Sequence, residues 1–288
     1  MPRLALIGAG RAAAHLGLAL QAAGQPIAAL GARDGARAAP LGAAMRLQVQ
    51  EPAAAVQAAD WVFLCVHDAA IAPLCASLPW RADQLVIHLS GATELAALDT
   101  ARACGAAVAG FHPLQLMAAP LPSPAQAVQA FAGIHVGIEA VAPWRDALDG
   151  LAQRLGATPL HLRAGQRARY HAAANAAASA LLAPLDLAAR QWALALGLSP
   201  AQAWAALAPL AEGTLRAARE RGLAGALSGP LARGDDAVLA AHVQALQGQD
   251  GVLYRALMHA LLPLAAEHLT PQAQARLLRA LDPDAAPS

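Results

Sequence analysis

Residues 4–17 read LALIGAGRAAAHLG, and this stretch decides the fold of the first half of the chain. A short apolar run ends in a G-x-G-x-x-A turn, and a helical pattern follows it directly. Gly8 permits the tight turn, Gly10 lets a pyrophosphate approach the backbone, and Ala13 lets the helix pack against the strand. The phosphates would lie on free N–H groups at the helix N-terminus, which predicts dinucleotide binding. The predicted cofactor-binding residues here are Gly8, Ala9, Gly10, Arg11 and Ala12.

The composition indicates a globular protein with no membrane span. The chain has 288 residues, of which 57% are hydrophobic and 14% charged, and much of the apolar content is alanine. The longest charge-free stretch, 104–138, is interrupted by four prolines and does not predict a spanning helix. No basic region precedes the first apolar run, so we expect no signal peptide and a cytoplasmic protein.

Charge and cysteine content exclude several functions. The net charge is +1 without a basic stripe, which argues against nucleic-acid partners. Cys65, Cys75 and Cys104 form no C-x-x-C pair, and we expect reduced thiols and no metal site. All 20 basic residues are arginine, so no lysine is available for catalysis.

The first part of the chain alternates short apolar runs with helical patterns, which predicts βαβ units and a parallel sheet. The predicted strands are 3–7, 26–30, 46–49, 61–66, 84–89, 106–110, 134–138 and 158–162. The predicted helices between them include 11–23, 69–77 and 93–103, and 112–124 is predicted as a loop.

From Gly165 onward, strand patterns disappear and long Ala/Leu helices dominate. The predicted helices are 166–196, 200–221, 235–247, 251–267 and 271–281, with a kink at Pro184. We therefore predict an α/β dinucleotide-binding domain of Rossmann type with a parallel sheet over residues 1–163. An all-α domain follows over 164–288, where we expect substrate binding and dimerisation.

The end of the second strand bears on which dinucleotide binds. Arg33 follows that strand, about 20 residues beyond Gly10, where a guanidinium suits the 2′-phosphate of NADP. Asp34 follows it directly, and an acidic residue there could instead hold the ribose of NAD. Arg33 favours NADP, and a second guanidinium on Arg11 either helps or is simply solvated.

Polar side chains follow three further strands, where the carboxyl ends of parallel strands meet a cofactor crevice. Val66 and His67 follow the fourth strand and are predicted to bind the cofactor, whereas we favour Asp68 as the cap of the next helix. Ser90 follows the fifth strand as a cofactor ligand or an N-cap. His112 follows the sixth and is a candidate to face the nicotinamide or the substrate.

A second cluster lies at the start of the helical half. His171, Asn175 and Ser179 have i, i+4, i+8 spacing in a helix otherwise made of small residues. Interhelical hydrogen bonds or a solvated edge would explain this spacing as well as a substrate-binding face would. In the second case the imidazole of His171 could donate a proton as hydride arrives.

A third segment, 226–236, is a turn with two glycines and a proline. Arg233 and Asp235 either form a local ion pair that orders this turn, or Arg233 and Ser228 bind a substrate carboxylate.

Five motifs together carry a family resemblance: GAGR at 8–11, HLSGA at 88–92, FHPLQ at 111–115, YHAAA at 170–174 and LSGPLARGD at 227–235. They resemble a bacterial family of Rossmann-like proteins with a helical C-terminal domain of unknown function, predicted to be NADP-dependent oxidoreductases. The resemblance implies fold relatives among pyrroline-5-carboxylate reductase, 6-phosphogluconate dehydrogenase, ketopantoate reductase and deazaflavin-dependent NADP oxidoreductase. It also implies a homodimer formed through the helical domain, which would cover the cofactor cleft.

The chain departs from these relatives in residues that matter for chemistry. The family commonly has Val-Pro-Asp where this chain has Val66-His67-Asp68, and Ser-Asn where it has Ala178-Ser179. The K-x-x-x-N pair of the 6-phosphogluconate and ketopantoate enzymes reads His171-x-x-x-Asn175 here, so the lysine mechanism cannot operate.

We therefore expect an NADP-dependent oxidoreductase acting on a small carbonyl, 2-keto acid or imino acid, with ketopantoate as the most specific candidate. Catalysis would rest on His171, Asn175 and His112, and substrate binding on Ser179, Ser228 and Arg233. The alternative is an NADP-binding sensor or regulatory protein without turnover.

Overall fold

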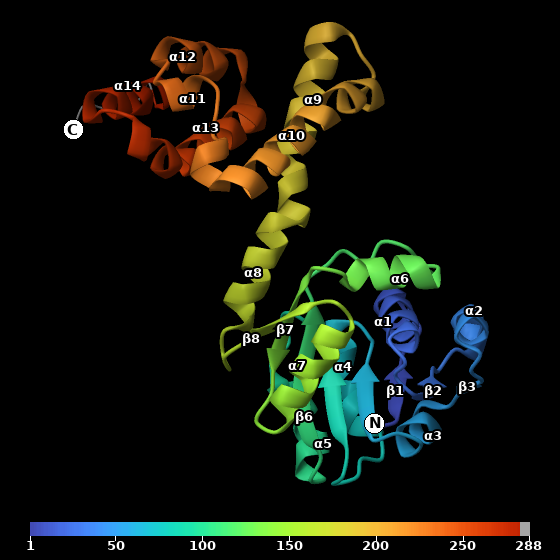
Figure 1. The fold of residues 1–288 in the computed structure, drawn as a ribbon. Coiled ribbons are helices and arrows are strands. Elements are labelled where there is room, and N and C mark those ends of the chain that lie inside the picture. Colours follow the sequence, from blue (N-terminus) through green and yellow to red (C-terminus); the bar gives the residue numbers. More distant parts are fainter. Residues whose placement is uncertain (283–288) are drawn as a thin grey trace. The chain divides into compact units, whose positions relative to one another are not determined.

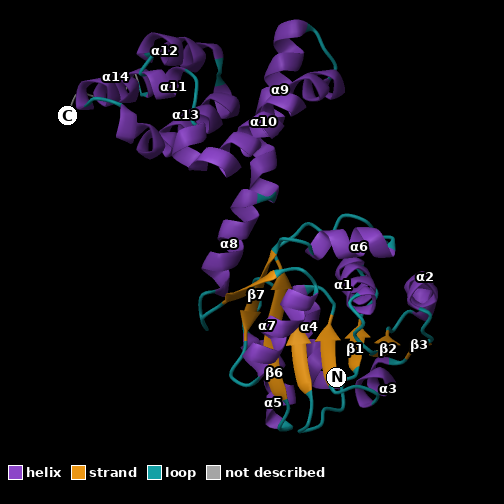
Figure 2. Ribbon diagram, viewed as in Figure 1, coloured by secondary structure: helices purple, strands orange, loops and turns teal. Residues whose placement is uncertain are grey.

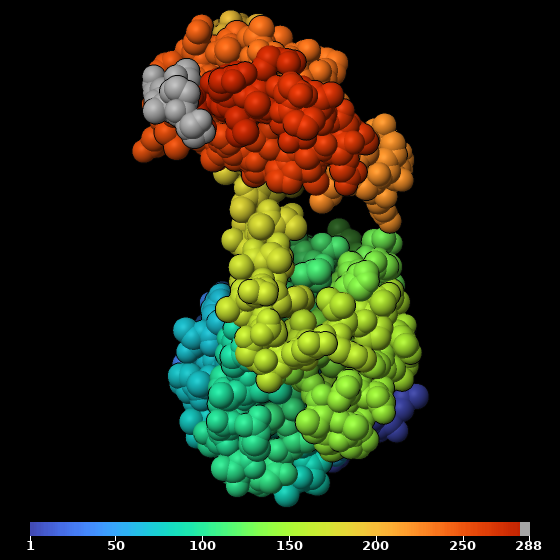
Figure 3. Space-filling model, turned by 90° about the vertical axis from the view of Figure 1, so that its left-hand side faces the viewer, coloured from blue at the N-terminus to red at the C-terminus, as the bar shows by residue number. Residues whose placement is uncertain are grey.

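The computed structural model describes residues 1–282, and the remaining six are drawn in grey in Figure 3. The chain divides into two compact units, Met1–Ala177 and the residues from Ala178 onward (Figure 1).

The first unit is built on an eight-stranded sheet with the order β3-β2-β1-β4-β5-β6-β7-β8. The strands are β1 (Leu4–Ile7), β2 (Ile27–Gly31), β3 (Val49–Gln50), β4 (Trp61–Leu64), β5 (Leu85–His88), β6 (Ala107–Pro113), β7 (His135–Glu139) and β8 (Thr158–His161). The six strands from β3 to β6 are parallel, which confirms the predicted Rossmann-type sheet. Strand β7 runs antiparallel to β6, and β8 is parallel to β7, so the sheet is parallel only in its larger part.

Helices cover both faces of this sheet (Figure 2). They are α1 (Arg11–Ala22), α2 (Gly35–Met45), α3 (Pro52–Gln57), α4 (Asp68–Ser77), α5 (Asp99–Ala103), α6 (Pro124–Phe131) and α7 (Trp144–Arg154), with a 3-10 turn, η1, at Leu95–Leu98. Alternate side chains of each strand enter opposite cores. Leu4 and Leu6 join the core beneath α1, α6 and α7, whereas Ala5 and Ile7 join the core beneath α3, α4 and α5.

Three local predictions need correction. The loop predicted from His112 begins only after Pro113, because β6 continues in register with β7, with His112 opposite Gly137. The strand predicted at 46–49 is displaced, since α2 extends to Met45 and Arg46 closes it in a left-handed conformation. The helix predicted at 93–103 consists of η1 followed by the short α5.

The second unit is helical, as predicted. Its helices are α9 (Leu182–Leu196), α10 (Pro200–Ala226), α11 (Pro230–Arg233), α12 (Asp236–Ala245), α13 (Gly248–Ala265) and α14 (Pro271–Leu281), with 3-10 turns η2 (Ser179–Leu181) and η3 (Ala266–His268). Leu231, Leu239, Val243, Leu277 and Leu281 form its buried core.

The predicted helix 166–196 is broken at Ala178 (φ −117°, ψ −94°), not kinked at Pro184. Pro184 lies in the first turn of α9, where a proline without an N–H breaks no helical hydrogen bond. The first fragment, α8 (Arg167–Ala177), is counted with the sheet. The structure therefore divides the chain at 177/178, where the sequence suggested 163/164, because side chains of α8 are anchored on the strands.

One stretch, Arg167–Leu196, is long and apolar enough to cross a membrane by length and composition alone. The break at Ala178 divides it into helices of 11 and 15 residues, each shorter than the ~20 residues that a straight span needs.

Candidate active site

The predicted phosphate turn joins β1 to α1. Gly8 has φ +116°, and a Cβ there would lie 2.4 Å from the carbonyl oxygen of Cys65 on the neighbouring strand, so only glycine fits. Ala13 is fully buried beneath the sheet. A Cβ on Gly10 would meet nothing within 4 Å, and Gly10 caps α1 without a side chain. No side chain caps the first amides of α1, and the side-chain position of Gly10 is open, an arrangement that suits phosphate binding.

Arg33 and Asp34 have different surroundings at the end of β2. Asp34 is the N-cap of α2, and its Oδ1 accepts a hydrogen bond from the backbone N–H of Arg37 at 2.9 Å. Arg33 is exposed, and no ion pair to it is found among residues 1–282. Its guanidinium is therefore available to a ligand, whereas the Asp34 carboxylate already stabilises a helix end.

The residues that follow β4 and β5 lie at the same edge of the sheet. His67 is the N-cap of α4, and Asp68 is the first residue of that helix, so the predicted capping role of Asp68 is wrong. Val66 packs partly into the core. The Ser90 hydroxyl accepts hydrogen bonds from the amides of Ala92 and Thr93, so its side chain closes the loop after β5.

His112, near the end of β6, is the last of these strand-end residues. Helix α8 places two aromatic side chains against it. His112 Nδ1 lies 2.8 Å from the phenol oxygen of Tyr170, with the rings edge to face at 5.5 Å. The ring of His171 lies 6.3 Å from that of His112. The three side chains form a cluster that we call the His112–Tyr170–His171 site.

Two glycines, Gly91 in the loop after β5 and Gly137 on β7, make room for this site. A Cβ on Gly91 would lie 2.7 Å from Cε1 of His112 and 2.9 Å from Cδ2 of His171. A Cβ on Gly137 would lie 2.6 Å from the phenol oxygen of Tyr170. The ring of Tyr170 can therefore lie over β7 only because position 137 has no side chain.

A buried ion pair anchors the first turn of α8. Arg167 is fully buried; its Nε donates to Glu139 Oε2 at 2.5 Å, and its Nη1 donates to the carbonyl oxygen of Ser90 at 2.7 Å. Gly110 on β6 leaves space for the guanidinium. Arg167, Tyr170 and His171 are spaced i, i+3, i+4 and share one face of α8. Fixing Arg167 therefore also fixes the two aromatic side chains above the sheet.

The electrostatics of the site keep the imidazoles of His112 and His88 neutral at pH 7. Burial, the neighbouring His171 and the Arg167 charge lower the pKa of His112 to about 4. Burial, together with the same guanidinium, lowers the pKa of His88, at the end of β5, to about 3. Burial raises the pKa of Tyr170, and the Arg167 charge partly opposes this. At neutral pH the site therefore contains a neutral His112 and a protonated Tyr170.

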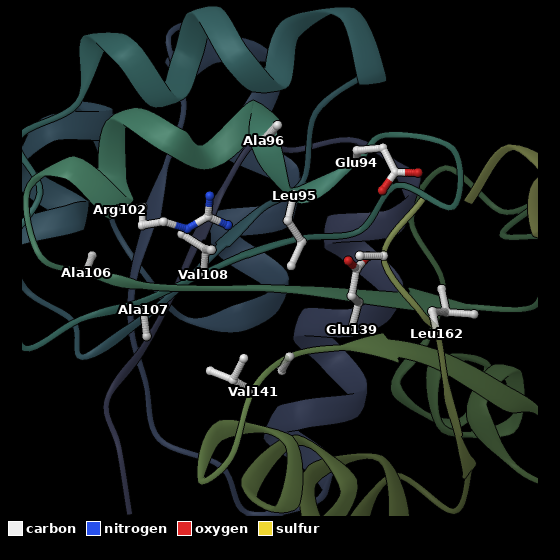
Figure 4. Close-up of a pocket in the computed structure, with 12 residues that line it drawn as sticks. Glu94, Leu95, Ala96, Arg102, Ala106, Ala107, Val108, Glu139, Val141 and Leu162 are labelled. Atoms are coloured by element: carbon white, nitrogen blue, oxygen red, sulfur yellow. The ribbon is translucent and has the colours of Figure 1, made fainter. Parts of the chain in front are cut away.

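A pocket of about 630 Å³ lies beside the ion pair (Figure 4). Glu94 and Glu139 lie at one end of it, with Arg102 at the other and mostly apolar residues between them. Both carboxylates hold α8, because Glu94 accepts hydrogen bonds from the amides of Gly165 and Arg167 while Glu139 binds the guanidinium. The charged end of this pocket thus belongs to the anchor of α8.

The remaining predicted site residues are not part of this cluster. Asn175 is exposed on α8, one turn beyond His171. Ser179 lies beyond the helix break, so the premise that it continues the helical face of His171 and Asn175 is wrong. Ser228 is exposed in the second unit, and Arg233 there pairs with Asp235 at 2.9 Å, the local ion pair considered as an alternative.

Sequence reasoning did not single out Tyr170, Arg167 or Glu139 as site residues. Tyr170 was visible only as the neighbour of His171 in a motif. Its partner His112 is 58 residues away in sequence, so no local pattern could indicate that the two side chains pair. In the part of the chain that the structure describes, no group of three or more His, Cys, Asp or Glu residues could hold a metal ion.

Comparisons with known proteins find family matches in both halves of the chain. Residues 3–91 match the family "NADP oxidoreductase coenzyme F420-dependent", and residues 134–261 match a domain of unknown function, DUF2520. A search of curated protein sequences finds no match.

Solved structures share the fold at low sequence identity. A protein from Bacteroides fragilis is 24% identical with a TM-score of 0.70, over 91% of this chain and 98% of its own. A pyrroline-5-carboxylate reductase from Coxiella burnetii is 16% identical with a TM-score of 0.59, over 97% of both chains. A reductive aminase from Aspergillus terreus, in complex with NADPH, is 17% identical with a TM-score of 0.61, over 96% of this chain and 98% of its own.

The chain thus joins a Rossmann domain of the NADP oxidoreductase type to a C-terminal region that matches a domain of unknown function, and it is an oxidoreductase of the nicotinamide-dinucleotide class.

Proposed function

We propose that this protein is an NADPH-dependent reductase of a small imino or 2-keto acid. The observation that carries the proposal is that one edge of one sheet holds both parts of such a site. The glycine turn at Gly8–Gly10 lies between β1 and α1, and the His112–Tyr170–His171 site lies at the end of β6 at the same edge. Ligands of doubly wound sheets bind at this edge.

The choice of NADPH rests on Arg33. Its guanidinium is exposed and available for a forked contact to a 2′-phosphate, whereas Asp34 already caps α2. Loss of one charge-assisted contact of this kind costs about 1.5–3 kcal/mol, roughly 10- to 100-fold in affinity.

The cofactor test is a pair of dissociation constants, measured by fluorescence of the bound reduced nicotinamide. We expect Arg33→Ser to weaken NADPH binding by about 10- to 100-fold and to leave NADH binding within about twofold. Arg154→Ser, an exposed arginine on α7, is the charge-matched control and should change neither constant. Tighter binding of NADH than NADPH by the unmodified protein would refute the assignment.

In the proposed reaction, bound NADPH supplies a hydride from C4 of its nicotinamide. The residues of the chain orient the substrate and supply the proton that its nitrogen or oxygen must gain. We propose that His112 and His171, whose rings lie 6.3 Å apart, hydrogen-bond the reacting group, and that Asn175, one turn further along α8, contributes to the same polar face. Since the chain has no lysine, the proton comes from another side chain or from water.

We propose a cyclic or acyclic imine as the substrate class, before 2-keto acids such as ketopantoate. Support comes from two of the structures that share this fold, a pyrroline-5-carboxylate reductase and a reductive aminase. The test is loss of NADPH absorbance with pyrroline-5-carboxylate, 1-pyrroline and ketopantoate. Reduction of at least one compound is expected. Tight NADPH binding without turnover across this panel would instead support a sensor or regulatory role.

We further propose that the helical unit binds a second copy of the chain. Leu194, Leu196 and Leu210 on α9 and α10 are 77%, 59% and 68% exposed, and Trp192 and Trp204 are each 41% exposed. Large apolar side chains exposed on two helices that pack together are typical of an interaction surface. Light scattering should give a dimer for the unmodified chain and a monomer for Leu194→Arg; a monomeric unmodified chain would refute this proposal.

A further inference from the structure

The hydroxyl group of Tyr170 points to a catalytic role within the function proposed above, on which this inference rests. We propose that Tyr170 is the proton donor of the reduction and that Nδ1–H of His112 holds its phenol oxygen. The pair is defined by a 2.8 Å separation of the two atoms and by edge-to-face packing of the two rings. Gly137, beneath the phenol group, leaves the ring its place.

Three side chains of the site could in principle give up a proton. His112 is neutral at working pH, because its pKa is lowered to about 4, and a neutral imidazole is a poor acid. His171 is exposed, and no hydrogen bond orients its ring among residues 1–282. Tyr170 keeps its proton at neutral pH and is held in place by His112. Of the three side chains, Tyr170 is the one that both carries a proton and is held in a fixed orientation.

The step balances without a further reactant. The hydride adds to the substrate carbon, the O–H bond of Tyr170 breaks, and a new N–H or O–H bond forms on the substrate heteroatom. The remaining phenolate accepts the Nδ1–H hydrogen bond of His112, and its negative charge faces Arg167. Solvent then returns a proton to the phenolate. Tyr170 is thus unchanged after each turnover.

Several charged or titratable groups face this pair. Arg167 and His171 come from α8, His88 from β5, and Asp68 from α4. Arg167 carries a positive charge, which stabilises the phenolate form of Tyr170 relative to the neutral phenol. Its buried pairing with Glu139 keeps that charge beneath the site.

The chain provides a matched control. It has only two tyrosines, and the second, Tyr254 on α13, forms a similar pair with His242 of α12 in the helical unit at 2.7 Å. Tyr254→Phe removes the same hydroxyl from the same kind of pair. It also leaves Tyr170 as the only phenol, so that its ionisation can be followed by ultraviolet absorbance without overlap.

The experiment measures kcat, NADPH affinity and ring protonation on the full chain. With the panel compound that the unmodified protein reduces, we expect Tyr170→Phe to lower kcat by about 100-fold or more, as loss of a general acid does. NADPH affinity should stay within about twofold, and Tyr254→Phe should retain full turnover. His112→Asn, whose amide nitrogen is as many bonds from Cα as Nδ1, should retain more turnover than His112→Leu.

Nuclear magnetic resonance of ¹⁵N-histidine gives a readout that does not need turnover. We expect the proton of His112 on Nδ1, and a shifted Nδ1 signal in Tyr170→Phe. A proton on Nε2, or full turnover by Tyr170→Phe, would overturn the inference while leaving the proposed function intact. Failure of the unmodified protein to reduce any panel compound would instead end the proposed function, and the catalytic role of Tyr170 with it.

Discussion

Two histidines, the buried His88 at the end of β5 and the partly buried His112 near the end of β6, make the fold sensitive to acid. His88 and His112 have pKa values of about 3 and about 4, against an ordinary value of 6.5. The unfolded chain therefore binds more protons than the folded one below pH 6.5, so stability is lost as pH falls from 6.5 toward the folded values. Between pH 7 and pH 5, each histidine removes about 2 kcal/mol, and the two together about 4 kcal/mol.

Urea unfolding followed by tryptophan fluorescence measures this loss, since Trp61 and Trp80 are buried in the same unit. We compare unfolding free energies at pH 7, 6 and 5. A His88→Asn, His112→Asn double variant should lose most of the slope, whatever its stability at pH 7. His268→Asn, at an exposed position, should keep the slope of the unmodified protein. A loss below about 1 kcal/mol between pH 7 and 5, or an unchanged slope in the double variant, would refute the reasoning.

Three further predictions concern the turn, the glycine at the site and the anchor of α8. Gly10→Ala should lower NADPH affinity more than tenfold in a fluorescence titration and change the free energy of unfolding by no more than about 1 kcal/mol. The reason is that the added Cβ meets no protein atom and enters only the space that a phosphate would use. Unchanged affinity would contradict this. Gly91→Ala should reduce kcat by about 100-fold and preserve folding, because a Cβ 2.7 Å from Cε1 of His112 displaces that ring. Steady-state rates measure this effect. A kcat within twofold of the unmodified protein would argue against it. Arg167→Met should destabilise the protein by about 3–5 kcal/mol in urea unfolding, because it leaves Glu139 buried and unpaired. Adding Glu139→Leu to the same chain should restore most of this loss. A cost of Arg167→Met below about 1 kcal/mol would show that the pair is not an anchor.

The fold was largely predictable because its signals are local. The apolar run before Gly8, the spacing of short strands and the capped helix starts at Ser199 and Thr270 each follow from a few consecutive residues. The antiparallel direction of β7 was not predictable in this way. A strand has the same alternation in either direction, and its direction here depends on where the chain returns after α6.

The candidate site was predictable in part. His112 and His171 stood out as polar residues at a strand end and on an apolar helix, and the structure brings them together. Arg167 did not stand out, because an arginine in a helical pattern is ordinarily solvated. Its burial depends on Gly110 and Glu139, which lie on two strands far from it in sequence, and only the folded sheet brings these three together.

The ion pair also explains how a loosely packed helix can position chemistry. Beyond its first turn, α8 is mostly small, exposed residues, so packing along its length gives it little hold on the sheet. Arg167 supplies the hold at one end through Glu139 and the Ser90 carbonyl, both at the strand edge where the site lies. Tyr170 and His171 follow Arg167 within about one helical turn. Any shift of α8 along the sheet would therefore break the pair with Glu139 and leave that buried carboxylate without a partner. The cost of burying an unpaired charge therefore fixes the register of the helix, and through it the distance between Tyr170 and His112.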